Sequence, residues 1–235
     1  MRSENSPLPL FQKTLALSPA ETEALLDVPV RRVSLSSDEP IVRRGDQSTS
    51  CILIVDGMLA TSKVVANGRR QITAVHIAGD FPDLMSLHLD HADSDIRSIG
   101  RSEIVSVGHA HLRRLALDHP TVGAKLWRVS LVDAAVAREW IANLGQRDAI
   151  SRMAHVLCEI LVRMQVAGLA VRNSCRMPLT QLNLSEVTGM SVVHVNRILQ
   201  ELRHRNLITL ALGHLDVLNW AALVKVADFN SDYLH

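Results

Sequence analysis

The sequence predicts an α+β fold: an N-terminal antiparallel β-roll of the jelly-roll type, one long helix, and a C-terminal helix-turn-helix with a hairpin wing. Three observations support this prediction. Short apolar runs alternate with turn residues from Val33 to Val107, apolar residues repeat at intervals of three and four after Pro120, and two helical patterns flank Gly189. The expected domains are residues 1–119 for the β-roll, 120–146 for the long helix and 147–235 for the winged part.

The composition is that of a globular protein. Of the 235 residues, 47% are hydrophobic and 21% are charged, with a net charge of +1. No N-terminal segment resembles a secretion signal, and no apolar run approaches the roughly 18 residues of a membrane span, so we expect a cytoplasmic protein without membrane contact. Cys51, Cys158 and Cys175 are isolated in the sequence, so neither a disulfide framework nor a CxxC motif is present.

The first third of the chain is interpreted from its cap and turn residues. Residues 7–28 begin with Pro-Leu-Pro-Leu-Phe and contain Ser18-Pro19, a cap and first turn, which predicts a short helix before the roll. Asn67-Gly68 lies between two runs of strand-forming residues and predicts a hairpin with a type I′ turn. Glycines are spaced by about a strand and a turn, as in an antiparallel roll, at positions 45, 57, 68 and 79.

A long helix with an apolar seam follows the roll. A short helix near His111–Leu117 precedes Pro120, which begins a helix that ends near Gly145. Because a helix so apolar along one seam needs a partner, we expect it to form a homodimer interface; packing onto its own β-roll is the alternative. The expected interface residues are Val122, Leu126, Val129, Val132, Val136 and Trp140.

Residues 178–219 have the pattern of a helix-turn-helix. Thr180 is a good N-cap for a first helix, Gly189 ends that helix with a left-handed cap, and Ser191 caps a second helix that begins at Val192. The second helix carries an apolar stripe of Val195, Ile198, Leu199 and Leu202. Its opposite face is the one that a recognition helix presents to base edges in the major groove: Val192, Val193, Asn196, Arg197 and Gln200.

The flanking elements complete a winged motif. Strand formers on both sides of Gly213-His214 predict a hairpin with a two-residue turn. Arg203 and Arg205 stand near Arg197, where all three are able to meet bases or phosphates; for Arg203 and Arg205 a solvated helix face is the alternative. With aromatic residues at 3%, stacking on single strands is disfavoured, so duplex DNA is the expected partner. A helical hairpin on a ribbon without nucleic acid remains the alternative. Further helices are expected at residues 147–165 and, capped by Asn219, 220–226.

The order of these elements resembles the CRP/FNR superfamily of bacterial transcription regulators over essentially the whole chain. The resemblance implies a homodimer that reads a pseudo-palindromic DNA site and touches RNA polymerase. The segments that carry it are Ile41-Val42-Arg43-Arg44-Gly45-Asp46, Asp56-Gly57, Asn67-Gly68-Arg69-Arg70-Gln71-Ile72, Gly79-Asp80-Phe81 and Thr188-Gly189-Met190-Ser191-Val192-Val193-His194-Val195-Asn196-Arg197.

The resemblance also implies roles in the recognition helix. Arg197 matches the arginine that family members direct at a guanine, while Ser191 and His194 match positions that tend to meet the phosphate backbone. Where well-known members carry a glutamate that accepts from cytosine N4, this chain has Val193, which is limited to apolar contact, for instance with a thymine methyl group. We therefore expect a half-site that differs from the usual family one at that base pair.

The sensor region departs from the cyclic-nucleotide-binding pattern. Gly79-Asp80-Phe81 is followed by Pro82-Asp83-Leu84 instead of Gly-Glu-Leu, and Asp93-Ser94 stands where an arginine pair holds the cyclic phosphate, with Arg97-Ser98 nearby. Because Asp90, Asp93 and Asp95 make the same loop unfavourable for an anion, we expect no cyclic nucleotide cofactor. Three scattered cysteines do not provide the ligands of an iron-sulfur cluster.

The remaining alternatives concern metals, redox chemistry and catalysis. His88, Asp90 and His91 suggest a metal or haem ligand, although a polar loop that is rich in histidine explains them better, and no metal site is predicted. Cys175 is a redox switch only if its pKa is lowered. No nucleophile elbow, phosphate loop or metal-ligand spacing indicates an enzyme. A regulator whose β-roll binds an unidentified small molecule, haem or metal and thereby controls DNA binding is the alternative function.

Overall fold

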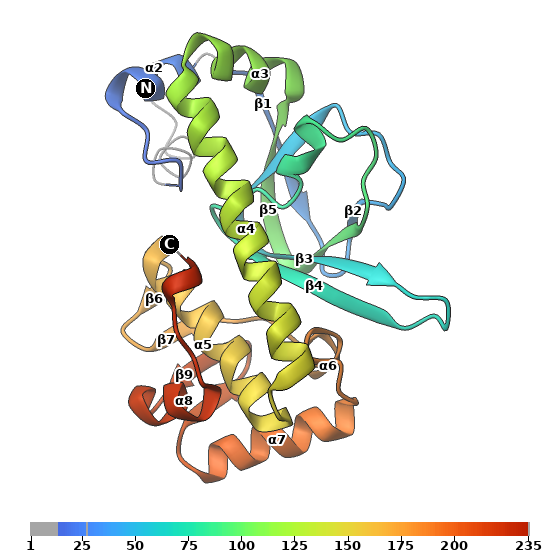
Figure 1. Ribbon diagram of the computed structural model, residues 1–235, viewed down its shortest axis with the longest axis vertical. Helices are drawn as coiled ribbons and strands as arrows, with labels where there is room; N and C mark the ends of the chain where they lie inside the picture. Colours follow the sequence, from blue (N-terminus) through green and yellow to red (C-terminus); the bar gives the residue numbers. More distant parts are fainter. Residues whose placement is uncertain (1–13, 27, 235) are drawn as a thin grey trace. The chain divides into compact units, whose positions relative to one another are not determined.

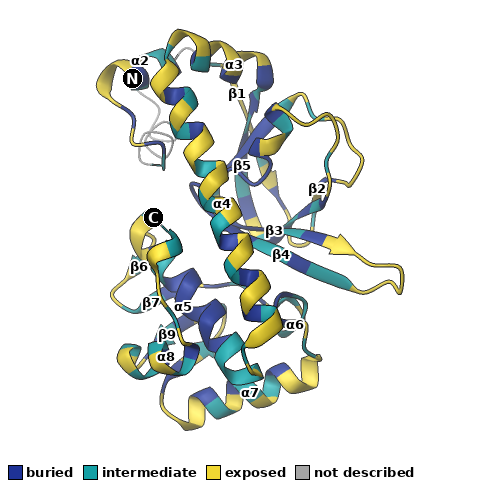
Figure 2. Ribbon diagram, viewed as in Figure 1, coloured by how far each residue is buried: buried dark blue, intermediate teal, exposed yellow. Residues whose placement is uncertain are grey.

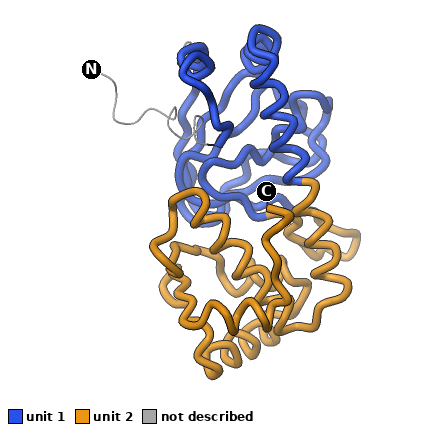
Figure 3. Tube along the Cα trace, turned by 60° about the vertical axis from the view of Figure 1, so that its left-hand side comes forward, with its two compact units in different colours: residues 1–62, 75–133 blue, residues 63–74, 134–235 orange. Residues whose placement is uncertain are grey.

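A computed structural model of the chain describes residues 14–26 and 28–234, so the predicted Pro-Leu-Pro-Leu-Phe start at residues 7–11 lies outside the described part. The chain divides into two compact units (Figure 3). The first contains the described residues up to Ser62 together with Val75–Asp133, and the second contains Lys63–Ala74 and Ala134 onward. The division falls inside the long helix, so that this helix contributes to both units.

The predicted antiparallel sheet, whose strands run in the order β1-β5-β3-β4 with β2 paired to β5, lies in the first unit except for the β3–β4 hairpin end at Lys63–Ala74, which belongs to the second (Figure 1). Gly57, in the middle of β3, has a φ of +87°, and a Cβ atom there would lie 2.7 Å from the Arg101 carbonyl oxygen of β5, so a larger residue is excluded at this bulge. The strands are β1 (Val30–Leu35), β2 (Pro40–Val42), β3 (Ser50–Val64), β4 (Arg70–Ile77) and β5 (Asp95–Gly108).

The β3–β4 hairpin forms at the predicted place with a different turn. Gly68 has a φ of +78°, but Asn67 does not have the positive φ that a type I′ turn requires at both central residues. The Val65 amide donates to the Arg69 carbonyl over 3.0 Å, and the Gly68 amide donates to the Val65 carbonyl over 2.9 Å. The predicted turn type is therefore wrong: the glycine alone takes the left-handed conformation, and Asn67 instead accepts the Arg69 amide through its side chain over 3.0 Å.

Helices α2 (Pro19–Leu26), α3 (His109–Asp118) and α4 (Pro120–Gln146) pack beside the strands of the first unit. As predicted, Ser18 caps α2, accepting from the Glu21 amide over 3.3 Å while the Glu21 carboxylate accepts from the Ser18 amide over 2.7 Å. Lys125 then donates to Glu21 over 2.6 Å and ties α2 to α4. The core between helices and strands includes Leu53, Phe81, Leu112, Val122 and Leu126, and it is closed by η1 (Leu84–Leu87) and α3. Buried stretches alternate with exposed ones along α4 (Figure 2).

The second unit surrounds α5 (Ala149–Ala167), which is buried along most of its length and is capped by Asp148. A four-stranded sheet runs in the order β6-β7-β9-β8, of which the sequence predicted only the last two strands. The predicted C-terminal helix is present, with Asn219 accepting from the Ala222 amide over 3.0 Å, and it packs against α5. The elements are β6 (Ala170–Val171), β7 (Ser174–Arg176), α6 (Gln181–Thr188), α7 (Val192–His204), β8 (Ile208–Ala211), β9 (His214–Val217), α8 (Trp220–Ala227) and η2 (Asp232–Leu234).

Candidate nucleic-acid interface

The helix-turn-helix is built by the predicted cap residues. Thr180 and Asn183 form a reciprocal capping box at the start of α6. Gly189 then takes the left-handed conformation with a φ of +67° and ends that helix. The Ser191 hydroxyl accepts from the His194 amide over 3.2 Å and begins α7. The predicted phosphate contact of Ser191 would therefore be made by a side chain that already caps the helix.

The apolar stripe of α7 packs against the rest of its unit. Val195, Leu199 and Leu202 are buried as predicted, whereas Ile198 is only half-buried. The stripe contacts α5 and α6, which fixes the rotation of α7 about its own axis. The opposite face of the helix is consequently turned toward solvent.

The solvent face of α7 carries the predicted reading residues. Val193 is 65% exposed, and Arg197 makes no hydrogen bond or ion pair with any residue that the structure describes. Asn196 differs, because it is half-buried and its side-chain amide nitrogen donates to the side-chain oxygen of Gln181 in α6 over 3.2 Å. The exposed members of the predicted set are Ser191, Val192, Val193, His194, Arg197 and Gln200. They form one surface with an uncommitted guanidinium group, the donor that a guanine edge requires.

The two arginines that follow the recognition helix serve the unit itself. Arg203 donates to the Leu210 carbonyl of β8 over 2.7 Å, and Arg205 pairs with Glu201 at 2.7 Å. These contacts tie α7 to the wing and close the last turn of the helix. Of the three clustered arginines that the sequence offered to DNA, Arg197 is the one whose guanidinium group is left without a partner among the described residues.

The wing turns one residue earlier than predicted. His214 belongs to β9 and pairs with Ala211, so that the two central residues are Leu212 and Gly213. Both have a positive φ, +52° and +74°. Leu212 is fully exposed at this tip. The prediction of a Gly213-His214 turn is wrong because it placed the glycine first, where the chain uses a leucine in a conformation that leucine rarely adopts.

Sequence reasoning missed the residues that brace the turn of the motif. Arg152 of α5 donates to the Thr188 carbonyl at the end of α6 over 2.9 Å, and to the carbonyls of Asn143 and Arg147 over 3.2 and 3.0 Å. Within the same unit, Arg70 pairs with Glu186 at 2.7 Å, and the side-chain amide of Gln71 donates to the Val187 carbonyl over 3.1 Å. Nothing in the local pattern around Arg152 marked it, because its three acceptors are backbone carbonyls.

The position that resembles a cyclic-nucleotide pocket is closed. The cavity lined by Thr61, Asp83 and Ser94 measures about 30 Å³, whereas small-molecule pockets measure roughly 300–1,000 Å³. Arg97, the nearby arginine, is held by Asp38, with 2.9 Å between Nε and Oδ1. The Asp83 carboxyl accepts the Ile52 amide over 2.7 Å through one oxygen, while its buried Oδ2 has no hydrogen-bond partner among the described residues. Burial raises the pKa of Asp83 to about 7.

The described part of the chain offers neither an activated thiol nor a cluster of metal-ligating side chains. Burial raises the pKa of Cys51 and Cys158 to about 12 and that of Cys175 to about 11, so Cys175 lacks the lowered pKa that a redox switch needs. Within residues 14–26 and 28–234, no group of three or more His, Cys, Asp or Glu side chains is placed to hold a metal ion. Over the same residues, no helix combines the length and apolarity needed to cross a bilayer.

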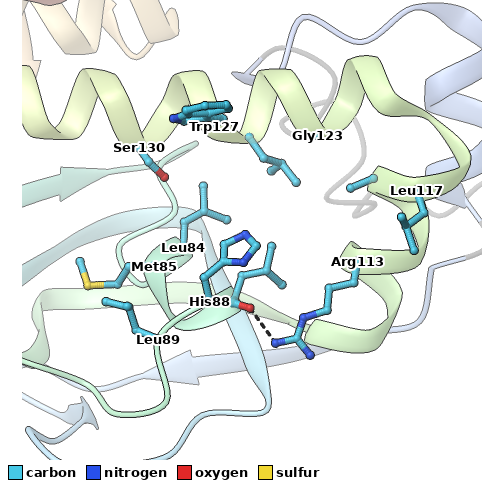
Figure 4. A pocket seen from close by; sticks show the side chains of 12 residues that line it. Leu84, Met85, His88, Leu89, Arg113, Leu117, Gly123, Trp127 and Ser130 are labelled. Carbon is cyan, nitrogen blue, oxygen red and sulfur yellow. Dashed lines mark hydrogen bonds between the residues drawn. The ribbon is translucent and has the colours of Figure 1, made fainter.

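A larger groove lies elsewhere in the first unit, between η1, α3 and α4 (Figure 4). It measures about 670 Å³ and is mostly apolar. Trp127 of α4 borders it and is 70% exposed, while Arg113 of α3 donates to the Leu87 carbonyl over 2.6 Å. Its walls are formed by Leu84, Met85, Leu87, His88, Leu89, Arg113, Ala116, Leu117, Gly123, Leu126, Trp127 and Ser130.

Two family profiles match the two parts of the chain. A cyclic nucleotide-binding domain matches residues 32–119, and a Crp-like helix-turn-helix domain matches residues 151–226. The chain is 21% identical over 216 residues to the fumarate and nitrate reduction regulatory protein of Vibrio cholerae, covering 92% of this chain and 86% of that protein. It is 24% identical over 199 residues to the nitrogen fixation regulation protein FixK of Bradyrhizobium diazoefficiens, covering 84% and 82%.

Solved structures share the fold. FixK2 from Bradyrhizobium japonicum superposes with a TM-score of 0.76 at 22% identity, covering 85% of this chain and 98% of that one. A CRP-family transcriptional regulator from Thermus thermophilus gives a TM-score of 0.66 at 18% identity, covering 86% and 99%. The predicted α+β fold class is thus confirmed, with the β-roll, the long helix and the helix-turn-helix in the predicted order.

Proposed function

Since the chain belongs to the CRP/FNR family of DNA-binding transcription regulators, we propose that it binds a pseudo-palindromic promoter site as a homodimer, without a cyclic nucleotide or an iron-sulfur cluster. The observation that carries the proposal is the solvent face of α7, where Arg197 and Val193 are exposed and no described residue engages the arginine. Two such helices, about one helical turn of DNA apart, read two half-sites.

For the dimer we propose a face of α4 other than the one expected from sequence, on the basis of which α4 side chains are exposed. Val122, Leu126, Val136 and Trp140 are buried within their own protomer, Val129 packs against the same core as Leu126, and Val132 is half-buried. Three large apolar residues of α4 are instead exposed by more than half: Trp127 at 70%, Leu131 at 57% and Ile141 at 71%.

These three residues follow the spacing of a helix-helix seam. The intervals of four and ten between them match positions on one face of a coiled coil. Such a row of exposed side chains costs free energy in water and is stabilised by a second copy of the same helix. We therefore propose that the dimer seam runs through Trp127, Leu131 and Ile141, and that the residues predicted from sequence hold α4 against its own protomer.

The absence of a cyclic nucleotide is supported by the closed cavity. A volume of about 30 Å³ holds roughly one water molecule. Arg97, the arginine nearest in sequence to Asp93-Ser94, is paired with Asp38 and is therefore not available to a phosphate. The 670 Å³ groove beside α4 favours a second candidate, a regulator whose DNA binding is controlled by a small apolar molecule. By family membership, we further propose that the protein acts in the cytoplasm and contacts RNA polymerase.

The test is selection of binding sites from random duplex DNA with purified protein and no added effector. We expect a twofold-symmetric site and a complex whose mass corresponds to two protomers per duplex. Recovery of single half-sites by a monomer contradicts the dimer. Binding only after addition of a small-molecule extract contradicts the effector-free proposal and favours the groove as a sensor.

A further inference from the structure

A carboxylate lies fully buried in the middle of α5. The Trp140 indole nitrogen of α4 donates to both oxygens of Glu159, over 3.0 and 2.9 Å. The Tyr233 hydroxyl, from the C-terminal tail, donates to one of them over 2.7 Å, and Arg163 lies 3.5 Å from the other. Three separate elements therefore converge on a single side chain.

A second buried group flanks the first. His155, one turn before Glu159, is fully buried, stacks on Tyr233 with 6.1 Å between ring centroids, and meets Phe229 edge-on at 5.3 Å. Its Nε2 atom lies 3.2 Å from the Glu139 carboxylate of α4, which in turn pairs with Arg147 at 2.7 Å. The tail after α8 is thus held by its two aromatic rings against His155 and by the Glu159 carboxylate.

The free-energy cost of burying the Glu159 carboxylate indicates that this cluster does more than stabilise the fold. Burying a carboxylate is costly even when it is paired, and an apolar residue of similar volume usually stabilises a fold at least as well. What the carboxylate adds is directionality, because its hydrogen bonds require the indole of α4 and the phenol of the tail at fixed positions. The geometry between α4 and α5 is thereby defined more narrowly than apolar packing alone would define it.

The same helix also holds the turn of the DNA-binding motif. Arg152, two turns before Glu159 on α5, donates to the Thr188 carbonyl, the last residue of α6. A continuous set of contacts therefore runs from Tyr233 and Trp140 through α5 to the residue that precedes Gly189. All of these residues belong to the second unit.

We propose that the C-terminal tail, residues 228–234, is a positioning element for DNA binding, in which Tyr233 holds α5 against the end of α4 through Glu159. The proposal rests on the proposed dimeric function. When the arm from α4 to α7 is rigid, binding of the first half-site places the second recognition helix close to its own half-site. A loose joint between α4 and α5 raises the conformational entropy lost when both helices bind. Tyr233 is thus a positioning residue that touches no DNA.

The experiment compares a full symmetric site with a duplex that carries one half-site. For Tyr233→Phe we expect full-site affinity to fall about 10-fold, and for truncation after Asp228 by more, while half-site affinity stays within about twofold of wild type. The matched control is Ser231→Ala, which removes one hydroxyl group from an exposed position of the same tail and should change neither affinity. Hydrogen exchange over residues 139–160 should quicken in Tyr233→Phe.

Several results overturn the proposal. Equal losses at full and half sites would place the tail's effect on the recognition helix itself, and a lower melting temperature with an unchanged ratio of full-site to half-site affinity would mean a structural role only. A Glu159→Gln background gives a further check, because the effect of Tyr233→Phe on that ratio should shrink there. If wild-type protein shows no preference for the full site, the dimeric function fails, whatever the variants do.

Discussion

The recognition surface on α7 and the small cavity of the β-roll differ in which polar group lacks a partner and in whether that group is exposed. On α7 the Arg197 guanidinium is exposed and no described residue pairs with it, whereas beside the cavity Arg97 is held by Asp38. At the cavity the polar atom that lacks a hydrogen-bond partner in the described chain is Asp83 Oδ2, and it is buried. An exposed donor without a partner is available to a ligand, while a buried acceptor without one is a cost to the fold. The comparison favours binding at α7 and not at the cavity.

The largest effect on DNA binding should come from removing the Arg197 guanidinium group, which no described residue engages. Each bidentate arginine-guanine contact contributes about 1–3 kcal/mol, and the proposed dimer would make two, so Arg197→Ala should weaken full-site binding by roughly 100-fold or more. Fluorescence anisotropy at fixed salt measures this. The control is Arg205→Ala, whose side chain pairs with Glu201 and should matter only a few-fold. Equal losses of DNA affinity in the two variants would mean that Arg197 contributes no more to binding than Arg205, which is paired with Glu201.

The buried carboxyl should be visible as a pH-dependent loss of stability. Because the pKa of Asp83 is raised to about 7 in the fold, the unfolded chain loses this proton first as the pH rises, and the free energy of unfolding falls between about pH 4 and pH 7. Asp83→Asn removes this dependence and should gain up to about 4 kcal/mol relative to wild type between pH 4 and pH 8. Urea unfolding of the two proteins at pH 4 and at pH 8 measures the change in the free energy of unfolding.

The matched control for this change is Asp90→Asn, in an exposed loop of the same unit. It should shift the free energy of unfolding by the same small amount at both pH values. A difference between Asp83→Asn and wild type that stays constant with pH would mean that the Asp83 carboxyl is ionised throughout the range. The cavity would then hold a charged group, as the recognition surface does, and the contrast between the two regions would weaken.

Specificity at one base pair gives a smaller effect. Val193→Glu supplies an acceptor for cytosine N4 on the exposed face of α7, so preference at the contacted base pair should move toward cytosine by about 1–3 kcal/mol. Competition among full sites that differ at that pair measures the shift. Leu218→Glu adds the same charge at an exposed position outside α7 and serves as the control. If the preferred base is unchanged, Val193 does not face a base edge.

The smallest effect concerns the wing. Leu212 is fully exposed with a φ of +52°, so replacing it loses no packing and relieves a left-handed conformation that costs about 1 kcal/mol. Leu212→Asn should therefore raise the free energy of unfolding by about 0.5–1 kcal/mol. Leu218→Asn, also exposed but without a positive φ, should give no gain. Loss of stability in Leu212→Asn would show that the leucine packs at the wing.

The parts of the fold that could be predicted from sequence are those encoded by local signals. Thr180, Gly189 and Ser191 form their caps as expected, because a cap depends on a few neighbouring residues. The wing turn escaped prediction, since a leucine at positive φ contradicts local preference and is held there by the pairing of β8 with β9. Strands β6 and β7 were missed because two or three residues are too few for a periodic pattern.

The orientation of α4 illustrates the second limit. Its sequence shows an apolar seam, but both Leu126 and Leu131 are apolar, and periodicity does not say which of two faces meets the chain's own core. The residues that hold α5 in place could not be predicted for a related reason. Glu159 and Tyr233 lie 74 positions apart and become a pair only through the tertiary fold. The exposed face of α7 was thus predictable from sequence, while the residues that support α7 were not.

The burial of all three cysteines has a practical consequence. Because Cys51, Cys158 and Cys175 are inside the fold with raised pKa values, oxidants and alkylating reagents find no reactive thiolate on the native protein. The protein also makes a convenient background for spectroscopy: a single cysteine introduced at the wing tip would carry a dye or spin label alone and would report the approach of the wing to a duplex.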